Sequence, residues 1–192
     1  GAGGTRTITV NPKNDQNGTS TITLQVKDGN NAVQTISFIV TVAAVNDTPV
    51  AADKVLNINE DAALQTVTKT SLITDPDIAT NTDVVTLTIT TAAQHGTAGI
   101  NASGNVTYIP NANFNGVDTF VYTATDLAGT TDTGTFTVNI AQVNDAPTTT
   151  ADTAVTNEDT AVDIMVLSND SDIDMQSGLN ANPSAESIGV VI

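Results

Sequence analysis

The sequence predicts an all-β protein in which two-sheet sandwich domains follow one another along the chain. Two observations predict this fold class. Apolar and polar residues, many of them threonine, alternate in one short run after another, which is the pattern of half-buried antiparallel strands. The phrase Val-Asn-Asp-x-Pro also occurs at both 45–49 and 143–147, and an offset of 98 residues (from 45 to 143) marks a tandem repeat. No stretch keeps a 3.6-residue apolar period long enough to predict a helix.

The repeat extends well beyond the shared phrase. Moving residues 5–49 along the chain by 98 positions, without a gap, aligns matching residues throughout. The matching pairs are Thr9/Thr107, Pro12/Pro110, Asn17-Gly18/Asn115-Gly116, Asp28/Asp126, Phe38/Phe136 and Val40/Val138. We therefore expect residues 1–49 to be the second half of one repeat, 50–147 a complete repeat, and 148–192 the first half of the next.

The complete repeat holds seven predicted strands. Each is a short alternating run bounded by Gly, Asn, Asp or Pro. They lie near 53–58, 63–69, 84–91, 97–101, 105–109, 118–125 and 133–142. Seven short strands in a repeat of this length are typical of an immunoglobulin-like Greek-key sandwich, although the Cys and Trp of antibody domains are absent.

The two half-repeats carry matching strands. The N-terminal half predicts strands near 7–11, 20–27 and 35–43. The C-terminal half predicts strands near 152–156, 162–167 and 187–192. Each half alone would expose an incomplete core and open sheet edges, which are templates for pairing with another chain.

Composition excludes several classes of function. The chain has 192 residues, no Cys, and a net charge of −16 with only five Lys and Arg. Nucleic-acid binding needs a basic surface, and an anionic membrane surface would repel this chain. No apolar run approaches the roughly 18–20 residues of a membrane span, so we expect no membrane insertion. Residues 1–10 lack a signal-peptide pattern, and we expect an internal segment of a longer protein.

The acidic residues gather between the predicted strands, in two sets of similar composition. The first set is Asn46, Asp47, Glu60, Asp61, Asp75, Asp77 and Asp126. The second is Asn144, Asp145, Glu158, Asp159, Asp170, Asp172 and Asp174, and Asp28 is the counterpart of Asp126. Converging carboxylates repel one another unless a cation lies among them, and Ca²⁺ takes six to eight oxygen ligands. Any single Asp or Asn has an alternative explanation in turn formation, but the repetition of the set favours calcium.

These motifs resemble the bacterial cadherin-like tandem repeats of large secreted adhesins of the biofilm-associated and RTX type. The resemblance covers essentially the whole chain. It rests on the linker phrase, the Asn-Glu-Asp after the first strand, the Asp-x-Asp loop, the run from Phe114 to Tyr122, and the Ala-x-Asp-x-x-Gly turn at Asp126. It implies cadherin-like sandwich repeats outside the cell or on the bacterial cell surface, with calcium at each junction between repeats.

The resemblance also implies which residues bind calcium. The first junction would use Asn46, Asp47, Asp75, Asp77 and Asp126. The second would use Asn144, Asp145, Asp170 and Asp172, with Glu60 from the complete repeat. Asp174 leaves the choice of the Asp-x-Asp pair open at this junction. The linker is shorter than the Asp-x-Asn-Asp-Asn-x-Pro of animal cadherins, which suggests one or two ions per junction. The absence of Trp means that strand exchange of the animal type does not carry over.

The leading hypothesis for function is a calcium-stiffened structural segment of an extracellular adhesin, used in cell adhesion and biofilm formation. The alternative is a carbohydrate-binding β-sandwich module. Such modules bind through exposed aromatic rings, whereas the four Phe and two Tyr here fall mostly on inward strand positions. We expect no enzyme, because the lone His95 lies in a turn without a nucleophile nearby in sequence. The paired carboxylates that could serve a glycosidase lie in linkers.

The half-repeats predict self-association. Residues 1–49 and 148–192 together nearly make one repeat, and an odd number of strands in the complete repeat places them at its opposite ends. We therefore expect two chains to complement each other, as a closed dimer or a head-to-tail fibre. Asp28 of one chain would then complete the second junction of another, and Glu158 the first. The alternative is a half that is loosely ordered or folds as a three-stranded remnant.

Overall fold

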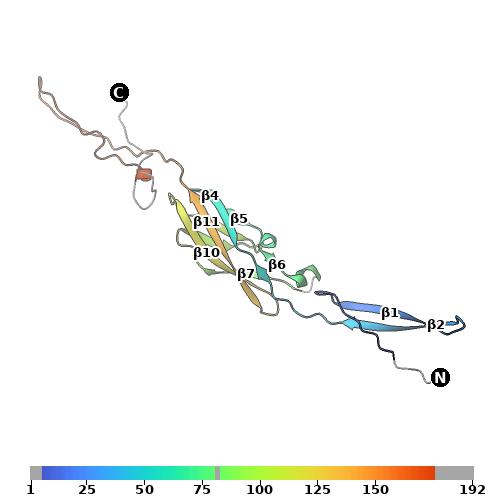
Figure 1. Cartoon of the computed structure of the whole chain (residues 1–192). Coiled ribbons are helices and arrows are strands. Elements are labelled where there is room, and N and C mark those ends of the chain that lie inside the picture. The colour runs from blue at the N-terminus through green and yellow to red at the C-terminus, as the bar shows by residue number, and fades with distance from the viewer. Residues whose placement is uncertain (1–5, 81–82, 176–192) are drawn as a thin grey trace. The chain divides into compact units, whose positions relative to one another are not determined.

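The computed structural model describes residues 6–80 and 83–175 (Figure 1). The described residues divide into two compact units, the first within 1–48 and 75–84, and the second within 49–74 and 85–192. Both are built from β-strands, to which the described part adds three short 3-10 helices. The predicted all-β class is therefore confirmed. No helix in the described part is long and apolar enough to cross a membrane.

The first unit is built on one antiparallel hairpin. Strand β1 (Gly18–Lys27) pairs with β2 (Val33–Val42) along its whole length. The 3-10 helix η2 (Pro76–Thr80) also belongs to this unit. The two strands predicted near 20–27 and 35–43 are confirmed. The strand predicted near 7–11 is wrong, because the structure gives these residues no partner strand.

The second unit contains two larger sheets and one short strand pair. The larger sheets have the strand orders β4-β11-β10-β7 and β5-β9-β8, and β3 pairs with β6. The strands are β3 (Val50–Ala51), β4 (Lys54–Asn59), β5 (Gln65–Val67), β6 (Ile73–Thr74), β7 (Thr86–Thr91), β8 (Gly96–Ile100), β9 (Val106–Pro110), β10 (Gly116–Thr125) and β11 (Thr131–Ala141). The 3-10 helix η1 (Lys69–Ser71) precedes β6, and η3 (Ile173–Met175) follows the strands.

The pairing of β4 with β11 determines where this unit begins and ends. These two strands are parallel, with Asn59 opposite Ala141, whereas the other strand pairs in the unit are antiparallel. In chain order, β4 is the first strand of the four-stranded sheet and β11 is its last. Because the two run in the same direction, the chain enters this sheet at one end and leaves it at the other. The linker after β11 consequently starts beside the residue that follows β4.

The two larger sheets enclose an aromatic core. Phe120, Tyr122 and Phe136 point inward from the four-stranded sheet, and Tyr108 points inward from the three-stranded sheet. The ring centroids of Phe120 and Phe136 lie 4.6 Å apart, and those of Phe120 and Tyr108 lie 5.7 Å apart. Alternate residues of β10 and β11 are buried, as the period-two pattern predicts.

The Asn-Gly-Val-Asp stretch at the start of β10 ends in Asp118, whose carboxylate has a structural role. Asp118 is buried, yet its two oxygens accept hydrogen bonds from the backbone N–H groups of Gln94, His95 and Thr119 at 2.9–3.1 Å. The hydroxyl of Tyr108 donates a further bond of 2.9 Å. Asp118 is therefore a satisfied structural residue that holds the loop before β8 against the core.

The strands of the complete repeat agree with the sequence prediction apart from their ends. The short pair β3–β6 was not predicted, and β5 is three residues long where 63–69 was expected. The strands predicted near 152–156 and 162–167 are wrong, because these residues form no ladder with another strand. The strand predicted near 187–192 lies outside the described residues.

Candidate metal centre

Glu60 is placed by the end of the β4–β11 ladder. Its backbone N–H donates to the carbonyl of Ala141 at 2.8 Å, which continues the parallel pairing by one residue. Its side chain is only 3% exposed, and Oε1 accepts a 2.6 Å hydrogen bond from the backbone N–H of Val143 in the linker. Oε2 is buried and has no hydrogen-bond partner. A glutamate held in this way presents one unsatisfied oxygen beside the linker.

Asp145 and Asp174 reach the same place from the linker and from η3. The backbone N–H of Asp145 donates to Oδ2 of Asp174 at 2.7 Å, and Gln142 donates to Oδ1 of Asp174 at 3.2 Å. The backbone N–H of Asp174 in turn donates to Oδ1 of Asp172 at 2.9 Å. A backbone bridge between Thr148 and Ser171 closes the loop that carries these residues.

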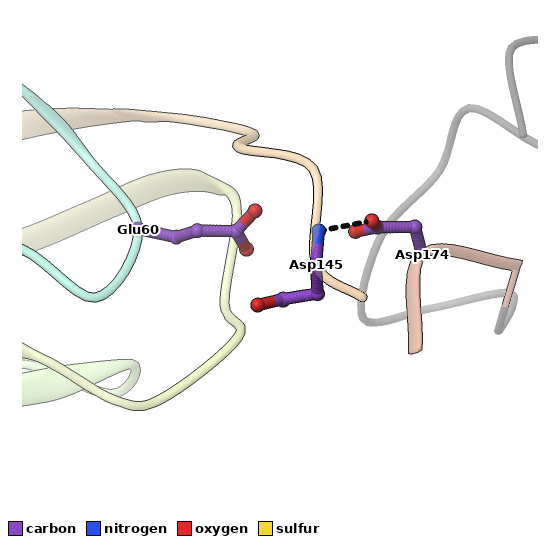
Figure 2. Close-up of side chains that lie close together, drawn as sticks. All are labelled: Glu60, Asp145 and Asp174. Carbon is purple, nitrogen blue, oxygen red and sulfur yellow. Dashed lines mark hydrogen bonds between the residues drawn. The ribbon is translucent and has the colours of Figure 1, made fainter. Parts of the chain in front are cut away.

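The three carboxylates form one cluster, shown in Figure 2. One oxygen each of Glu60, Asp145 and Asp174 lies within 4.8 Å of the others. Oδ2 of Asp145, like Oε2 of Glu60, is buried without a hydrogen-bond partner. Three acids from three segments of the chain thus meet with two unsatisfied oxygens, a donor set that fits a hard divalent cation.

The electrostatics of the cluster oppose the charged state of its members. Burial raises the pKa of Glu60 above its usual value, the hydrogen bond from Val143 lowers it, and the charges of Asp174, Asp145 and Asp61 raise it further. Burial likewise raises the pKa of Asp145, with added contributions from the nearby carboxylates of Asp61, Asp174 and Asp172. A cation among the oxygens would reverse both effects.

The first unit repeats this linker arrangement. The backbone N–H of Asp47 donates to Oδ2 of Asp77 at 2.8 Å, and the backbone N–H of Asp77 donates to Oδ1 of Asp75 at 2.8 Å. Burial raises the pKa of Asp47, and the charges of Asp15, Asp77 and Asp75 add to the shift. A pocket of about 190 Å³ is lined in part by Asp15, Asp47 and Asp77, with Lys13 on its wall.

The linker asparagines make the same local contact in both copies. The side-chain amide of Asn46 donates to the carbonyl of Asp47 at 3.0 Å, and that of Asn144 donates to the carbonyl of Asp145 at 2.8 Å. The two linkers therefore share a backbone conformation in which the amide side chain braces the peptide that precedes Thr48 or Ala146.

Asp28 and Asp126 occupy equivalent turns, as their alignment predicts. Asp28 accepts hydrogen bonds from the N–H groups of Asn30 and Ala32 in the β1–β2 turn. Asp126 accepts one from the N–H of Thr130 at 2.7 Å in the β10–β11 turn, and its other oxygen contacts the Thr130 hydroxyl. Each aspartate stabilises the turn of its own unit.

Two other predicted ligands lie apart from the carboxylate cluster. Oδ1 of Asp170 accepts a 2.8 Å hydrogen bond from the N–H of Thr150, and Glu158 is exposed in a turn. The structure thus places Asp172 and Asp174, rather than Asp170 and Asp172, in the hydrogen-bond pattern of Asp75 and Asp77. The repeat offset is the signal that identifies this pair: Asp75 and Asp77 lie 97 residues before Asp172 and Asp174, close to the period of 98.

His95 lies against an aromatic ring, and the Phe and Tyr side chains are wholly or partly buried. The His95 ring stacks on Phe114, with centroids 4.0 Å apart, at the surface of the second unit. Every Phe and Tyr lies among the described residues and is buried or half-buried. The rings that a carbohydrate-binding surface would expose therefore belong to the core or to hairpin packing.

Comparison with known proteins identifies the middle of the chain. Residues 46–139 match the family described as bacterial Ig domain, whereas no curated protein matches the chain. A solved structure of protocadherin gammaB7 EC3-6, a cis-dimer, is similar with a TM-score of 0.51 at 20% identity, covering 74% of this chain and 37% of that one. An endo-fucoidan hydrolase of glycoside hydrolase family 107, MfFcnA4, gives a TM-score of 0.40 at 15% identity, covering 67% of this chain and 19% of the hydrolase.

The family match and the protocadherin likeness confirm the predicted fold class, an all-β sandwich of the bacterial Ig-like and cadherin-like kind. The family match over residues 46–139 indicates a non-catalytic structural domain of the kind found in extracellular surface proteins. The chain spans about a fifth of the hydrolase and under two fifths of the protocadherin chain, and the protocadherin likeness concerns the fold alone.

Proposed function

We propose that this bacterial Ig-like, cadherin-like domain is a calcium-dependent structural repeat of an extracellular adhesin, which stiffens a chain of repeats for cell adhesion. The observation that supports it best is the carboxylate cluster of Glu60, Asp145 and Asp174 with its two buried oxygens that lack partners. Buried polar atoms without partners are uncommon in folded proteins and call for an explanation. A bound cation supplies one.

The donor set favours calcium over other metals. All three side chains offer hard carboxylate oxygens, and the chain has no Cys and only one His. His95 lies in the loop before β8, outside the cluster. Oxygen-only sites suit Ca²⁺ or Mg²⁺, and Ca²⁺ takes more protein oxygen ligands and demands a less regular geometry than Mg²⁺.

The three residues come from three different segments of the chain. Glu60 belongs to the body of the sandwich, Asp145 to the linker and Asp174 to the segment that follows. Bound calcium would supply the positive charge that lets all three remain ionised at short distance. Glu60 and Asp174 would then hold the linker from both sides and restrict its backbone rotation, while Pro147 already restricts the residue before it.

A calcium titration of the purified chain tests the proposal. We expect saturable binding with a dissociation constant of about 10⁻⁴ to 10⁻³ M, the range of extracellular modules. Asp174→Asn removes the charge of one cluster member and is expected to weaken binding at this site. Asp163→Asn changes an exposed acid outside the cluster; it is the matched control and is expected to leave binding unchanged. If the titration of the wild-type chain gives no heat of binding and the chain retains no metal, the calcium site is rejected.

A further inference from the structure

The first and last strands of the four-stranded sheet, β4 and β11, form one continuous parallel ladder. Every residue of β4, from Lys54 to Asn59, lies opposite a residue of β11, from Phe136 to Ala141 (Figure 1). The backbone N–H of Glu60 donates to the carbonyl of Ala141 at 2.8 Å and adds one bond beyond the last pair. Because the backbone bonds of a parallel ladder are evenly spaced, the two strands are joined along the whole of β4.

The direction of the two strands determines how tension along the chain would load this ladder. The chain reaches β4 at its Lys54 end, through β3, and leaves β11 at its Ala141 end. Because the strands are parallel, these two points lie at opposite ends of the ladder. Tension on the chain before β3 and after β11 therefore pulls β4 and β11 in opposite directions along the strand axis. The bonds of the ladder are then strained together, whereas strands pulled apart from one end lose their bonds one after another.

Two carboxylates fasten the segment that enters β4 to the start of β11. Oδ1 of Asp53 accepts a 2.7 Å hydrogen bond from the backbone N–H of Thr135. Oδ2 of Asp132 accepts one of 2.8 Å from the backbone N–H of Ala51. Each segment thus supplies a charged acceptor to the backbone of the other, and hydrogen bonds to charged groups are the stronger kind. Both bonds lie where tension would enter the sheet and must break before β4 can slide.

Two further contacts oppose sliding of the strands. Within the ladder, the side-chain amide of Asn139 donates to Oδ1 of Asn57 at 2.8 Å. The hydroxyl of Tyr122, a fully buried side chain, donates to the carbonyl of Ala52 at 2.7 Å. Because the Tyr122 ring lies in the core, the segment that enters β4 is tied to the centre of the domain as well as to β11.

The pairing that precedes this ladder is short by comparison. β3 pairs with β6 through two residues, Val50 and Ala51, so tension meets little resistance before it reaches β4. Within β4, the side chains of Leu56 and Ile58 pack against the core. A shift of β4 by one residue would turn these side chains to the other face of the sheet. Sliding therefore costs core contacts in addition to the hydrogen bonds of the ladder.

We propose that the β4–β11 ladder is a load-bearing clamp, which resists tension along a chain of repeats because it is loaded in shear. This function goes beyond the proposed role of calcium. The ion would stiffen the linker against bending, whereas the clamp opposes stretching and unfolding of the repeat itself. Resistance to force depends on the rate of unfolding rather than on the free energy of unfolding. A repeat of ordinary stability can therefore hold under tension when its two ends are joined in this geometry.

Single-molecule force spectroscopy of the full chain tests the clamp by changing only the direction of pulling. The chain has no Cys, so thiol handles can be placed at chosen exposed positions. The shear variant carries Val50→Cys and Ala146→Cys, which lie before β4 and after β11. The opening variant carries Asn59→Cys and Ala146→Cys, so both handles act at the end of the ladder where Asn59 lies opposite Ala141.

The two pulling directions have different expected outcomes. We expect the shear variant to unfold at a force at least about twice that of the opening variant at the same loading rate, because its bonds must fail together. The measurements are made in EDTA, so the result does not depend on the calcium proposal. Equal forces in the two geometries, or a lower force in shear, would overturn the clamp.

Substitutions at Asp53 separate the clamp from general stability. Asp53→Ala removes the acceptor for the N–H of Thr135, and we expect the unfolding force to fall in the shear variant. The force should stay unchanged in the opening variant, where the ladder fails from its Asn59 end and the contact of Asp53 is reached last. Asp53→Asn keeps an oxygen acceptor and is expected to retain the shear force of the unsubstituted chain. An equal loss in both geometries for Asp53→Ala would overturn the part of Asp53 in the clamp, because the contact would then act through overall stability alone.

Discussion

At Glu60, burial and charge oppose each other when no cation is bound. The side chain is nearly inaccessible, one oxygen has no partner, and two other carboxylates lie within 4.8 Å. Glu60→Gln keeps the size of the side chain and an oxygen to accept the bond from Val143. In EDTA we expect an unchanged or higher Tm, because the variant buries no unpaired charge.

In calcium the same variant is expected to lose most of the calcium-dependent stabilisation. For the wild-type chain that gain amounts to about 2.7 kcal/mol when free calcium is about 100 times the dissociation constant. Thermal unfolding followed by circular dichroism, in EDTA and in calcium, measures both effects, with Asp163→Asn as control. A Glu60→Gln variant that gains as much stability from calcium as the wild type would show that Glu60 is not a ligand.

The raised pKa values of Glu60 and Asp145 predict how stability depends on pH in EDTA. A carboxyl group whose pKa is higher in the folded state binds its proton more tightly there. Its contribution to stability is complete below the ordinary carboxyl pKa, near 4, and is lost as the pH rises through the raised folded value. We therefore expect the Tm in EDTA to rise as the pH is lowered from neutral towards about 5.

Calcium should reverse this dependence of Tm on pH, because a bound cation favours the ionised carboxylates. Asp132 acts in a separate pH range: hydrogen bonds from the backbone of Ala51 and Thr133 lower its pKa, so its contribution is lost only as the pH falls below the ordinary carboxyl range. Melting curves between about pH 5 and 8, with EDTA or calcium, measure the two slopes. Equal slopes in both conditions would contradict the cluster's electrostatics.

Prediction of single residues from the sequence worked best where the offset of 98 residues pairs a position with its counterpart in the other repeat. The equivalence of Asp28 with Asp126, and of Asn46 with Asn144, follows from the 98-residue offset. In the structure both aspartates accept a hydrogen bond from the N–H four residues on, and both asparagines donate to the carbonyl of the next residue. At the second junction the string Asp-x-Asp occurs twice, as Asp170-Ser-Asp172 and as Asp172-Ile-Asp174, so the sequence leaves the choice of the pair open. The hydrogen bond between Asp145 and Asp174 depends on loop closure, which the string does not encode.

At the scale of elements, Gly134 shows how tightly β11 packs against the core. A Cβ atom added to it would lie 2.6 Å from the Tyr122 ring. The ring is itself fixed, because its hydroxyl donates to the carbonyl of Ala52 at 2.7 Å. We expect Gly134→Ala to destabilise the domain by about 1–3 kcal/mol through overpacking, measured by chemical denaturation.

Gly99→Ala is the matched control for that substitution. Gly99 also lies within a strand, β8, and the nearest atom to an added Cβ is Oγ1 of Thr107 at 3.4 Å, an ordinary contact. We expect a change near zero, or a slight gain from reduced freedom of the unfolded chain. Equal losses for the two variants would mean that glycine is needed in these strands for a reason other than the Tyr122 ring.

Elements were predictable from the sequence where an alternating run is long enough to show its period and has a neighbouring strand in the fold. β7, β10 and β11 follow their alternating patterns closely, since one face meets the core. β3 and β6 have two residues each and carry no period to detect. The run 152–156 has a strand-like composition, but a strand also requires a neighbour for its backbone groups, and composition does not supply one.

At the scale of the whole molecule, the tandem repeat was visible in the sequence, and the family match and fold agree with sandwich domains. The direction of the chain through the complete repeat also follows from the number of strands. The parallel pairing of β4 with β11 does not, because it depends on which strands become neighbours in the folded sandwich. It is this pairing that brings Glu60 beside the second linker.

The proposed role as a stiffening repeat predicts a change in the range of lengths that the chain samples. Without calcium, the carboxylates of Glu60, Asp145 and Asp174 repel one another and the linker after β11 is held mainly by the hydrogen bonds of Val143 and Asp145. With calcium, the same three residues should fix the linker to the sandwich. Small-angle X-ray scattering at concentrations where the chain is monomeric should therefore give a narrower distribution of maximum dimensions in calcium than in EDTA. Glu60→Gln should give the broad distribution in both conditions and Asp163→Asn the wild-type response, whereas identical wild-type profiles in calcium and EDTA would mean that packing alone sets the stiffness of the linker.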